Sequence, residues 1–171
     1  MVYDLIIIGS GAAGLSAAIY AGRYLMKVLV INGEFGGETA KAGVIWNYPG
    51  AKGIDGYELM EVMKGQAADV NTEFVDGKVT ELKKTDLGVE VVLDGGEKFS
   101  GKTLLIGMGA ERRRLGLPNE KELTGRGVHY CVTCDGPVYT GKTIAMVGGG
   151  DASIKGVNLA AQFAKKIYLI C

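Results

Sequence analysis

Two cysteines separated by two residues are the part of this sequence with the most evident chemistry. Cys131 and Cys134 form a Cys-x-x-Cys pair, and Asp135 directly follows the second thiol. A pair at this spacing can open and close a disulfide with little backbone movement, and its geometry often lowers the pKa of one thiol. A neighbouring carboxyl group can hold a proton and deliver it to a leaving thiolate as a general acid. Cys131, Cys134 and Asp135 are therefore the candidate catalytic residues.

Two other roles for these cysteines are less well supported by the sequence. A four-ligand zinc site would need both thiols together with His129, the only histidine, and the distant Cys171. This spacing is unlike that of zinc-binding motifs, so we predict no metal site. An inert, buried cysteine pair is the other alternative. For His129 by itself, a packed or exposed side chain is a more common role than that of a proton carrier.

A glycine-rich segment near the amino terminus predicts a dinucleotide site. Residues 9–14 read Gly-Ser-Gly-Ala-Ala-Gly, a complete G-x-G-x-x-G. The apolar run 5–8 before it predicts a buried strand, the alanine-rich segment 15–24 after it predicts a helix, and a second strand is expected at 27–31. In this context the glycines allow a tight turn, the approach of a pyrophosphate and close packing of helix on strand. The candidate binding residues in this loop are Gly9, Gly11, Ala12, Ala13 and Gly14.

The residue expected to bind the ribose departs from the usual pattern. An acidic side chain commonly ends the second strand and binds the ribose hydroxyls, whereas this chain has Asn32, followed by Gly33 and Glu34. An asparagine amide donates and accepts hydrogen bonds, so Asn32 can still contact the ribose. The alternative is that Asn32 only forms a turn with Gly33. Both interpretations stay open, and all three residues are kept as candidate binding residues.

The middle of the chain predicts one helix and several short strands. Asp55 is expected to cap a helix over 56–70, and Met63 on its apolar stripe is interpreted as a core residue. A further buried strand is expected at 103–106. Three short runs separated by turn residues predict a small antiparallel meander, at 73–75, 78–82 and 89–93.

The opening pattern returns near the carboxyl end, so the sequence contains an internal repeat. A strand predicted at 143–147 is followed by three glycines, 148–150, and by a helix to about residue 165. When the first glycines of the two loops are aligned, Lys27 and Lys166 fall at the same offset, each before an apolar strand. Cys171 then takes the position of Asn32. The repeat predicts a second, incomplete dinucleotide-binding unit.

Together these elements predict an α/β chain with two domains. The first, residues 1–113, is expected to be a Rossmann-like three-layer dinucleotide-binding fold that carries the small antiparallel meander. The second, residues 114–171, is expected to carry the Cys-x-x-Cys pair and to begin another unit of the same kind. The charged run Glu-Arg-Arg-Arg at 111–114 marks the expected boundary, and its arginines are interpreted as a solvated linker.

Composition and charge argue against several classes of function. With 19 basic and 19 acidic side chains the formal net charge is zero, which argues against nucleic acid or an anionic membrane as the main partner. No apolar run reaches the roughly 20 residues that span a bilayer. The first residues lack the basic start and small-residue cleavage site of a secretory signal. We therefore expect a cytoplasmic protein, in which a structural disulfide framework is uncommon.

The chain resembles the low-molecular-weight thioredoxin reductases, which are FAD-dependent pyridine nucleotide-disulfide oxidoreductases, from its first residue to its last. The dithiol motif followed by Asp-Gly is the most diagnostic part of this resemblance, and related peroxiredoxin-reducing flavoproteins share it. The segments that carry the resemblance are 9–14, 36–38, 47–50, 116–118, 125–128, 131–136 and 148–150.

The resemblance implies cofactors, a reaction and a set of residue roles. Electrons would pass from NADP(H) or NAD(H) through FAD and the disulfide to thioredoxin or a similar small dithiol protein, in a homodimer. Cys134 would face the flavin, Cys131 would be its disulfide partner and Asp135 the acid. FAD would also contact Gly37, Glu38, Asn47, Val79, Gly107, Gly109 and Ala110. The nicotinamide nucleotide would contact Gly148, Gly150, Asp151 and Ser153.

The sequence also departs from the family pattern. Relatives usually have Ala-Thr-Gly where this chain has Gly107-Met108-Gly109, and commonly Gln in place of Glu38. The arginine pair that binds the 2′-phosphate of NADPH would follow Cys171, as would the return segment that completes the FAD domain. We therefore expect a truncated chain or an unusually short gene product that is inactive with a nicotinamide nucleotide. Some relatives take electrons from other donors.

Three functions are compatible with these observations. The first is an FAD-dependent reductase of a small dithiol protein, including one that serves a peroxiredoxin. The second is a non-catalytic FAD-binding fragment whose dithiol is never turned over. The third is a monooxygenase or oxidase built on the same nucleotide fold, because a fold does not fix its chemistry. Replacement of Cys134 by serine separates the first from the third, since an oxidase should keep its activity.

Overall fold

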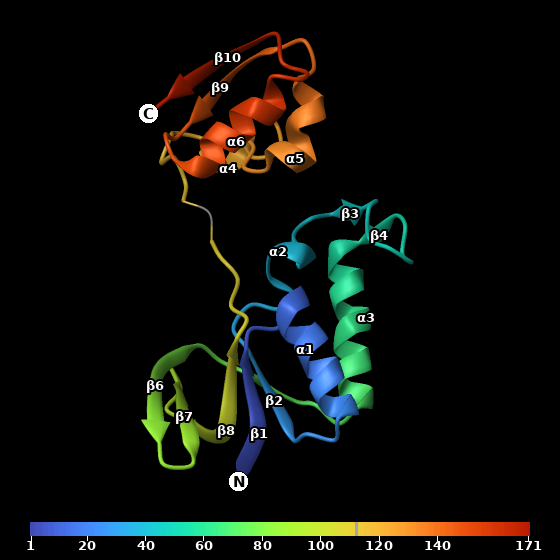
Figure 1. Cartoon of the computed structure of the whole chain (residues 1–171), viewed down its shortest axis with the longest axis vertical. Helices are drawn as coiled ribbons and strands as arrows, with labels where there is room; N and C mark the ends of the chain where they lie inside the picture. The colour runs from blue at the N-terminus through green and yellow to red at the C-terminus, as the bar shows by residue number, and fades with distance from the viewer. Residues whose placement is uncertain (112) are drawn as a thin grey trace. The chain divides into compact units, whose positions relative to one another are not determined.

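The computed structural model describes residues 1–111 and 113–171, and the chain divides into two units, Met1–Ala110 and Glu111–Cys171 (Figure 1). The predicted boundary run 111–114 includes Arg112, which lies outside the described residues. In the described part of the chain, no helix combines the length and the apolar character needed to cross a membrane.

The first unit is built on a sheet of six strands in the order β5-β2-β1-β8-β7-β6. β5, β2, β1 and β8 run parallel to one another, whereas β7 and β6 continue the sheet in antiparallel pairs. The central strand β1 contains the apolar run 5–8, for which the sequence predicts a buried strand. The strands are β1 (Val2–Ile8), β2 (Val28–Asn32), β5 (Glu73–Asp76), β6 (Val79–Thr85), β7 (Gly88–Leu93) and β8 (Lys98–Ile106).

The two faces of the parallel strands bury different side chains. Ile7 packs with residues of the helices α1 (Ala12–Arg23) and α3 (Gly56–Asp69). Ile6 points to the opposite face, because successive side chains in a strand alternate, and it packs with Val91 and Leu93 of β7. Figure 1 shows α1 and α3 on one side of β1 and β2, with β6 and β7 on the other. The predicted Rossmann-like three-layer α/β fold is therefore confirmed.

The helix α3 begins at the predicted residue. The carboxylate of Asp55 accepts hydrogen bonds from the backbone N–H groups of Tyr57 at 2.9 Å and Glu58 at 3.4 Å, as expected of an N-cap residue. Met63 and Met60 are buried against α1, so the interpretation of the methionine as a core residue is confirmed. The remaining short elements of this unit are α2 (Gly37–Ala40), β3 (Val44–Ile45) and β4 (Ile54–Asp55).

The meander is built from different strands than the sequence predicts. The run 73–75 is not part of it but forms β5, which pairs in parallel with β2 at the edge of the sheet. The meander consists instead of β6, β7 and the first part of β8. The run 103–106 is likewise not a separate strand but the end of the nine-residue β8. This strand serves both parts of the sheet, because one of its edges pairs with β7 and the other with β1.

The second unit repeats the strand–helix–strand arrangement of the first. β9 (Thr143–Val147) and β10 (Lys166–Ile170) pair in parallel, and α6 (Asp151–Ala160) connects them. Leu5 faces Val28 in the first pair of strands and Thr143 faces Lys166 in the second, so both partners are 23 residues apart. The predicted repeat is thus present, although α6 ends at Ala160 rather than near residue 165. Three short helices precede it: α4 (Glu120–Leu123), α5 (Val132–Asp135) and the 3₁₀ helix η1 (Gly136–Tyr139).

Candidate functional site

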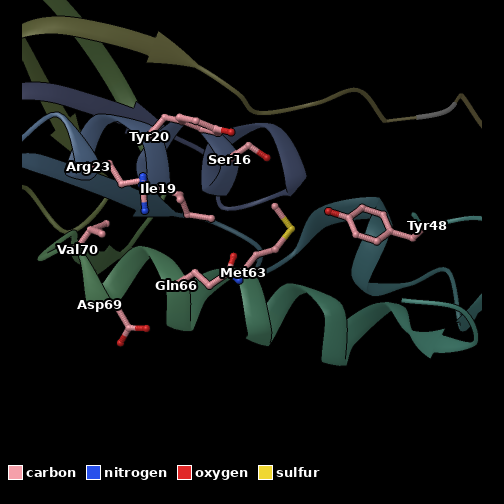
Figure 2. A pocket seen from close by; sticks show the side chains of 9 residues that line it. All are labelled: Ser16, Ile19, Tyr20, Arg23, Tyr48, Met63, Gln66, Asp69 and Val70. Atoms are coloured by element: carbon pink, nitrogen blue, oxygen red, sulfur yellow. The ribbon is translucent and has the colours of Figure 1, made fainter. Parts of the chain in front are cut away.

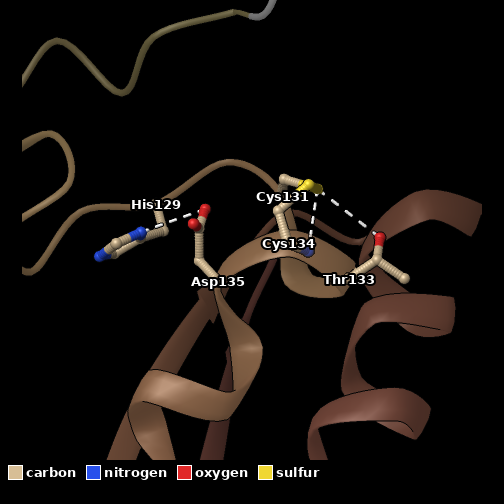
Figure 3. Close-up of a disulfide and its surroundings, with 5 residues drawn as sticks. All are labelled: His129, Cys131, Thr133, Cys134 and Asp135. Carbon is tan, nitrogen blue, oxygen red and sulfur yellow. Dashed lines mark hydrogen bonds and ion pairs between the residues drawn. A yellow bond between two sulfur atoms is a disulfide. The ribbon is translucent and has the colours of Figure 1, made fainter. Parts of the chain in front are cut away.

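Cys131 and Cys134 form a disulfide at the start of the short helix α5 (Figure 3). Cys131 is the N-cap residue of this helix, and its Sγ accepts a hydrogen bond from the backbone N–H of Cys134, with 3.2 Å between nitrogen and sulfur. The two Cα atoms lie 5.3 Å apart, within the usual range for disulfide-bonded cysteines. Cys134 is exposed and Cys131 is half-buried, so the pair is not enclosed in the protein interior.

A histidine contacts the carboxyl group that follows the disulfide. Nδ1 of His129 lies 3.1 Å from Oδ2 of Asp135, and Figure 3 shows the two side chains pointing toward each other. The His129 ring packs edge-on against the ring of Tyr139, with 5.3 Å between ring centroids. The Tyr139 hydroxyl donates to the carbonyl oxygen of Gly127 at 3.0 Å. Burial raises the pKa of Tyr139, and the nearby charge of Asp135 raises it further, so this hydroxyl keeps its proton.

A buried carboxylate connects the start of the second unit to the residue before Cys131. Glu120 is only 6% exposed and accepts hydrogen bonds from the backbone N–H groups of residues 115–117, at 2.7 to 3.2 Å. It also accepts a hydrogen bond from the hydroxyl of Tyr130. The hydrogen bond from the Tyr130 hydroxyl contributes most to holding the pKa of Glu120 below its usual value. The same hydrogen bond raises the pKa of Tyr130. Glu120 therefore fixes where the chain enters the disulfide segment.

The glycine-rich loop of the first unit leaves the start of α1 open to an anion. No side chain caps this helix, and its first turn carries no acidic residue. The unpaired N–H groups and the positive end of a 12-residue helix favour a phosphate at this position. Gly9 has a φ of +103°, and a Cβ on Gly14 would overlap the carbonyl oxygen of Gly9. The loop therefore fits the pyrophosphate of a dinucleotide.

Several predicted binding residues are brought together around this loop. The N–H of Gly107 donates to the carbonyl oxygen of Ile8 at 2.8 Å, and a Cβ on Gly9 would press on the carbonyl of Gly107. A Cβ on Gly37 would lie 4.0 Å from Cα of Gly11. The backbone of Gly9, Gly11, Gly37 and Gly107 thus forms one glycine-lined region at the carboxyl ends of β1 and β8.

The other predicted FAD contacts lie at separate places in the first unit. Glu38 lies in α2, where its carboxylate is 3.5 Å from Nζ of Lys41. Asn47 lies in the exposed segment between β3 and β4, and Val79 is the first residue of β6. Gly109 and Ala110 follow β8 at the end of the unit.

The side chain of Asn32 is held between two other polar side chains. Its Nδ2 donates to Oδ1 of Asp76 at 2.7 Å, and its Oδ1 accepts a hydrogen bond from the buried hydroxyl of Ser10. Both polar ends of the Asn32 amide therefore have partners within the first unit. Glu34 instead contacts Nζ of Lys41 at 2.9 Å, and this hydrogen bond raises the pKa of Lys41.

The loop of the second unit has the same backbone geometry as the first. The N–H of Gly148, at a φ of +118°, donates to the carbonyl oxygen of Ile170 at 2.7 Å. In the first unit the N–H of Gly9 donates to the carbonyl oxygen of Ile31 at 2.9 Å. Like α1, the helix α6 begins after a glycine, Gly150, without a side-chain cap. The two loops therefore present their backbones in the same way.

The side chains of the second loop are less favourable for a phosphate. Asp151 lies in the first turn of α6, where its negative charge opposes the binding of an anion, although Nζ of Lys155 is 2.8 Å away. Ser153 stands at the position of Gly14 and directs its hydroxyl to the carbonyl oxygen of Val147 at 3.4 Å. The two loops thus share a backbone but differ in charge.

A groove lies elsewhere on the first unit, between α1 and α3 (Figure 2). Its volume is about 600 Å³, and none of the predicted site residues lines it. The lining residues are Ser16, Ile19, Tyr20, Arg23, Tyr48, Met63, Gln66, Asp69 and Val70. Among the residues that the structure describes, no three or more His, Cys, Asp or Glu side chains are grouped so as to hold a metal ion.

Known proteins match this chain over nearly its whole length. The family model described as pyridine nucleotide-disulphide oxidoreductase matches residues 3–171. The chain is 42% identical to a thioredoxin reductase of Mycolicibacterium smegmatis, over 99% of this chain and 55% of that protein, and 38% identical to one of Bacillus subtilis (strain 168), over 99% and 54%. A crystal structure of thioredoxin reductase from Streptococcus pyogenes MGAS5005 matches with a TM-score of 0.87 and 37% identity, over 98% of this chain and 55% of that one. The chain thus spans about half the length of these relatives.

Proposed function

The chain belongs to the pyridine nucleotide-disulphide oxidoreductase family, and from this we propose that it is a flavoprotein that passes electrons through the Cys131–Cys134 disulfide to thioredoxin or a similar small dithiol protein. The observation that carries the proposal is this disulfide, which is partly exposed and is followed by a carboxyl group in contact with His129. The relatives named thioredoxin reductase support the choice of a dithiol protein as partner. The electron donor would be NAD(P)H or another reductant.

The glycine-rich loop of the first unit supports the proposed binding of FAD. The pyrophosphate would lie at the open start of α1, over Gly11 and Ala12, and the region around Gly107 would lie beside it. Asn32, at the end of β2, would contact the adenosine ribose. When bound, FAD would supply the two electrons that open the disulfide.

The residues of the second unit account for the rest of the chemistry. Two electrons break the bond between the two sulfur atoms and leave two thiolates, and Asp135 delivers a proton to one of them. By family resemblance, Cys134 would face the flavin and Cys131 would be its disulfide partner. One thiolate then attacks the partner's disulfide to form a mixed disulfide, and the second thiol loses its proton and releases the partner as a dithiol. The Cys131–Cys134 disulfide is restored, and the partner has gained two electrons and two protons, one released by the second thiol and one taken from the solvent.

The visible spectrum and the state of the cysteines test this proposal together. The purified chain, reconstituted with FAD, should keep the absorption bands of bound flavin after gel filtration. Anaerobic photoreduction of that flavin should then make Cys131 and Cys134 accessible to an alkylating reagent, counted by mass spectrometry. Cys171 is a free, exposed thiol and should be labelled before and after reduction, so it serves as an internal standard.

Two results would contradict the proposal in different ways. If no flavin is retained, the chain is not a flavoprotein. If flavin is retained and reduced but the disulfide stays closed, the chain is a non-catalytic FAD-binding protein. The Cys134→Ser variant is the matched control, because it cannot form the disulfide and its Cys131 should be alkylated with or without reduced flavin.

A further inference from the structure

We propose that Asp76 supplies the carboxylate that recognises the adenosine ribose of the flavin cofactor, in partnership with Asn32. This inference rests on the proposed function, because it concerns how the first unit holds FAD. It accounts for the absence of an acidic residue at the end of β2, where the ribose hydroxyls of a dinucleotide are commonly bound.

The backbone places the two side chains next to each other. β2 and β5 are parallel, and Asn32 and Asp76 are directly paired at the ends of these strands. The N–H of Gly77 also donates to the carbonyl oxygen of Asn32 at 3.0 Å, which holds the two chain segments together just beyond the sheet. Both side chains therefore leave the sheet at its carboxyl edge, where open parallel sheets bind their ligands.

The orientation of the Asn32 amide follows from the chemistry of its neighbours. A carboxylate only accepts hydrogen bonds, so the NH₂ group of Asn32 must face Asp76, at 2.7 Å. The amide oxygen then faces Ser10, whose hydroxyl must be the donor. Ser10 is 1% exposed and belongs to the glycine-rich loop. The hydrogen bonds run in a single direction from Ser10 through Asn32 to Asp76, and they fix both polar ends of the amide.

The groups left over match the two hydroxyls of a ribose. One Nδ2 hydrogen of Asn32 is not used in this series of hydrogen bonds. Asp76 is exposed, and no hydrogen bond found among the described residues uses its Oδ2. The carboxylate oxygen can accept from one ribose hydroxyl while the amide donates to the other. A phosphate on the 2′-oxygen would be repelled by the carboxylate. The pair is therefore suited to an unphosphorylated adenosine ribose, as in FAD.

Glu34 is the other acidic side chain near the end of β2, and it is already engaged. Its carboxylate lies 2.9 Å from Nζ of Lys41, and the same lysine is 3.5 Å from Glu38. Asp76 is instead linked to Asn32, which in turn is linked to the loop that would carry the pyrophosphate. Asp76 is therefore the acidic side chain that is linked to the proposed pyrophosphate site.

Binding of FAD and FMN to Asp76→Asn tests the inference without any measurement of activity. Because a hydrogen bond to a charged acceptor is lost, FAD should bind the variant about tenfold more weakly than it binds the wild-type chain. FMN lacks the adenosine ribose, so its affinity should be the same for both chains. Asp86→Asn, in the exposed turn between β6 and β7, is the matched control and should bind FAD like the wild type. An equal loss for FAD and FMN, or no loss for FAD, would overturn the inference.

A swap of the two side chains provides the second test. The double variant Asn32→Asp/Asp76→Asn keeps one carboxylate and one amide in the same pair, so it should recover the FAD affinity to within about threefold of wild type. If the single variant binds weakly and the swap does not recover, while the swap unfolds at the same denaturant concentration as wild type, the inference is wrong. Failure of the wild-type chain to bind FAD would instead overturn the proposed function itself.

Discussion

Asp135 belongs to a small group of side chains that fixes the position of its carboxyl group. His129 contacts Asp135 at 3.1 Å and is itself packed against Tyr139, whose hydroxyl is tied to the backbone at Gly127. A proton donor acts efficiently only when its geometry toward the reacting atom is maintained. The group therefore holds the carboxyl group of the residue that follows Cys134 in one position, and this arrangement leads to two predictions.

The first prediction concerns the acid itself. Asp135→Asn replaces the carboxyl group by an amide, which cannot deliver a proton to the leaving thiolate. We expect the rate at which reduced flavin is reoxidised by the disulfide, measured by anaerobic stopped-flow absorption, to fall by about 100-fold or more. Asp86→Asn changes an exposed carboxylate of the first unit in the same way and should leave the rate as it is. An unchanged rate in Asp135→Asn would remove this residue from the proposed chemistry.

The second prediction separates the contact of His129 with Asp135 from the packing of the His129 ring. His129→Leu fills much of the same space but has no donor, so the carboxyl group of Asp135 loses its anchor and the same rate should fall by about tenfold. His129→Asn keeps an N–H group close to the position of Nδ1, and it should recover most of the rate. If the two variants are equally slow, the ring packing against Tyr139 matters and the contact with Asp135 does not.

The third prediction is a pH dependence that comes from Glu120. Hydrogen bonds from the Tyr130 hydroxyl and three backbone N–H groups bind its charged form and lower its pKa from the ordinary 4.5. A group whose pKa is lowered by folding stabilises the native state above its ordinary pKa, and that stabilisation is lost as the pH falls through the lowered pKa. Glu120→Gln should therefore unfold at lower temperature than wild type at neutral pH, and this difference should shrink as the pH falls below 4.5.

Thermal unfolding followed by circular dichroism, from about pH 3 to about pH 7, checks this prediction. Glu122→Gln is the matched control, because Glu122 is an exposed carboxylate in the same helix, α4. Its unfolding temperature should follow that of wild type throughout. A difference between Glu120→Gln and wild type that is constant with pH would mean that Glu120 acts through packing and not through its charge.

The residues around the disulfide could be predicted from sequence only where they are contiguous. Cys131, Cys134 and Asp135 form one motif, and their types alone indicate the chemistry. Glu120 could not be predicted, because its role depends on a turn of the chain that brings Tyr130 back to it. The pairing of Asn32 with Asp76 spans 44 residues and becomes visible only when β2 and β5 are known to be neighbours.

Among the elements, those defined by local chemistry could be predicted and those defined by pairing could not. Asp55 caps α3 through its own carboxylate, and the glycine-rich loops have the expected geometry, because both depend on a few adjacent residues. The run 73–75 has the same short apolar pattern whether it is a parallel edge strand or part of a meander. Its partner is chosen by the crossover through α3, which returns the chain to the edge of β2.

The fourth prediction concerns the close packing of α1 on β1. By helix propensity alone, Gly14→Ala should stabilise the protein by about 1 kcal/mol. The added Cβ would overlap the carbonyl oxygen of Gly9, however, and overpacking of this kind costs about 1 to 3 kcal/mol. We therefore expect a net loss in the free energy of unfolding, measured in urea.

The repeated unit offers a matched comparison for this variant. Ser153 is the counterpart of Gly14 in the second loop and already carries a Cβ. Ser153→Ala should change the free energy of unfolding by no more than about 0.5 kcal/mol, because it adds no atoms and removes one weak hydrogen bond. A stabilising Gly14→Ala would show that the loop relaxes around the new methyl group and that the glycine is not required there.

Across the whole chain, the two units differ in how well their sheets are covered. In the first, Ile6 and Ile7 of β1 are fully buried between helices and meander. Among the described residues of the second, two strands pair, and Tyr168 and Ile170 of β10 are about half exposed, at 51% and 50%. Isolated two-stranded sheets are marginally stable in water. The second unit should therefore open more readily than the first.

Hydrogen–deuterium exchange followed by mass spectrometry tests this fifth prediction. Peptides that cover β9 and β10 should exchange their amides at least about tenfold faster than peptides that cover β1 and β2, because local opening of a poorly covered sheet requires less free energy. Addition of FAD should slow exchange at β1 and β2 further if the first unit binds it. Equal protection of the two sheets would mean that the second unit is stabilised by contacts other than its strand pairing.

The equal spacing of the two strand–helix–strand units has a consequence for the history and the engineering of the chain. Each unit has a segment that runs from the first glycine of its loop to the strand residue whose carbonyl oxygen accepts from that glycine's N–H. The two segments, Gly9 to Ile31 and Gly148 to Ile170, have the same length. Duplication of one ancestral gene segment leaves this kind of arrangement behind, because a copied segment keeps its register. The two segments can therefore be exchanged as cassettes without shifting any later residue, and such chimaeras would report whether ligand preference travels with the loop.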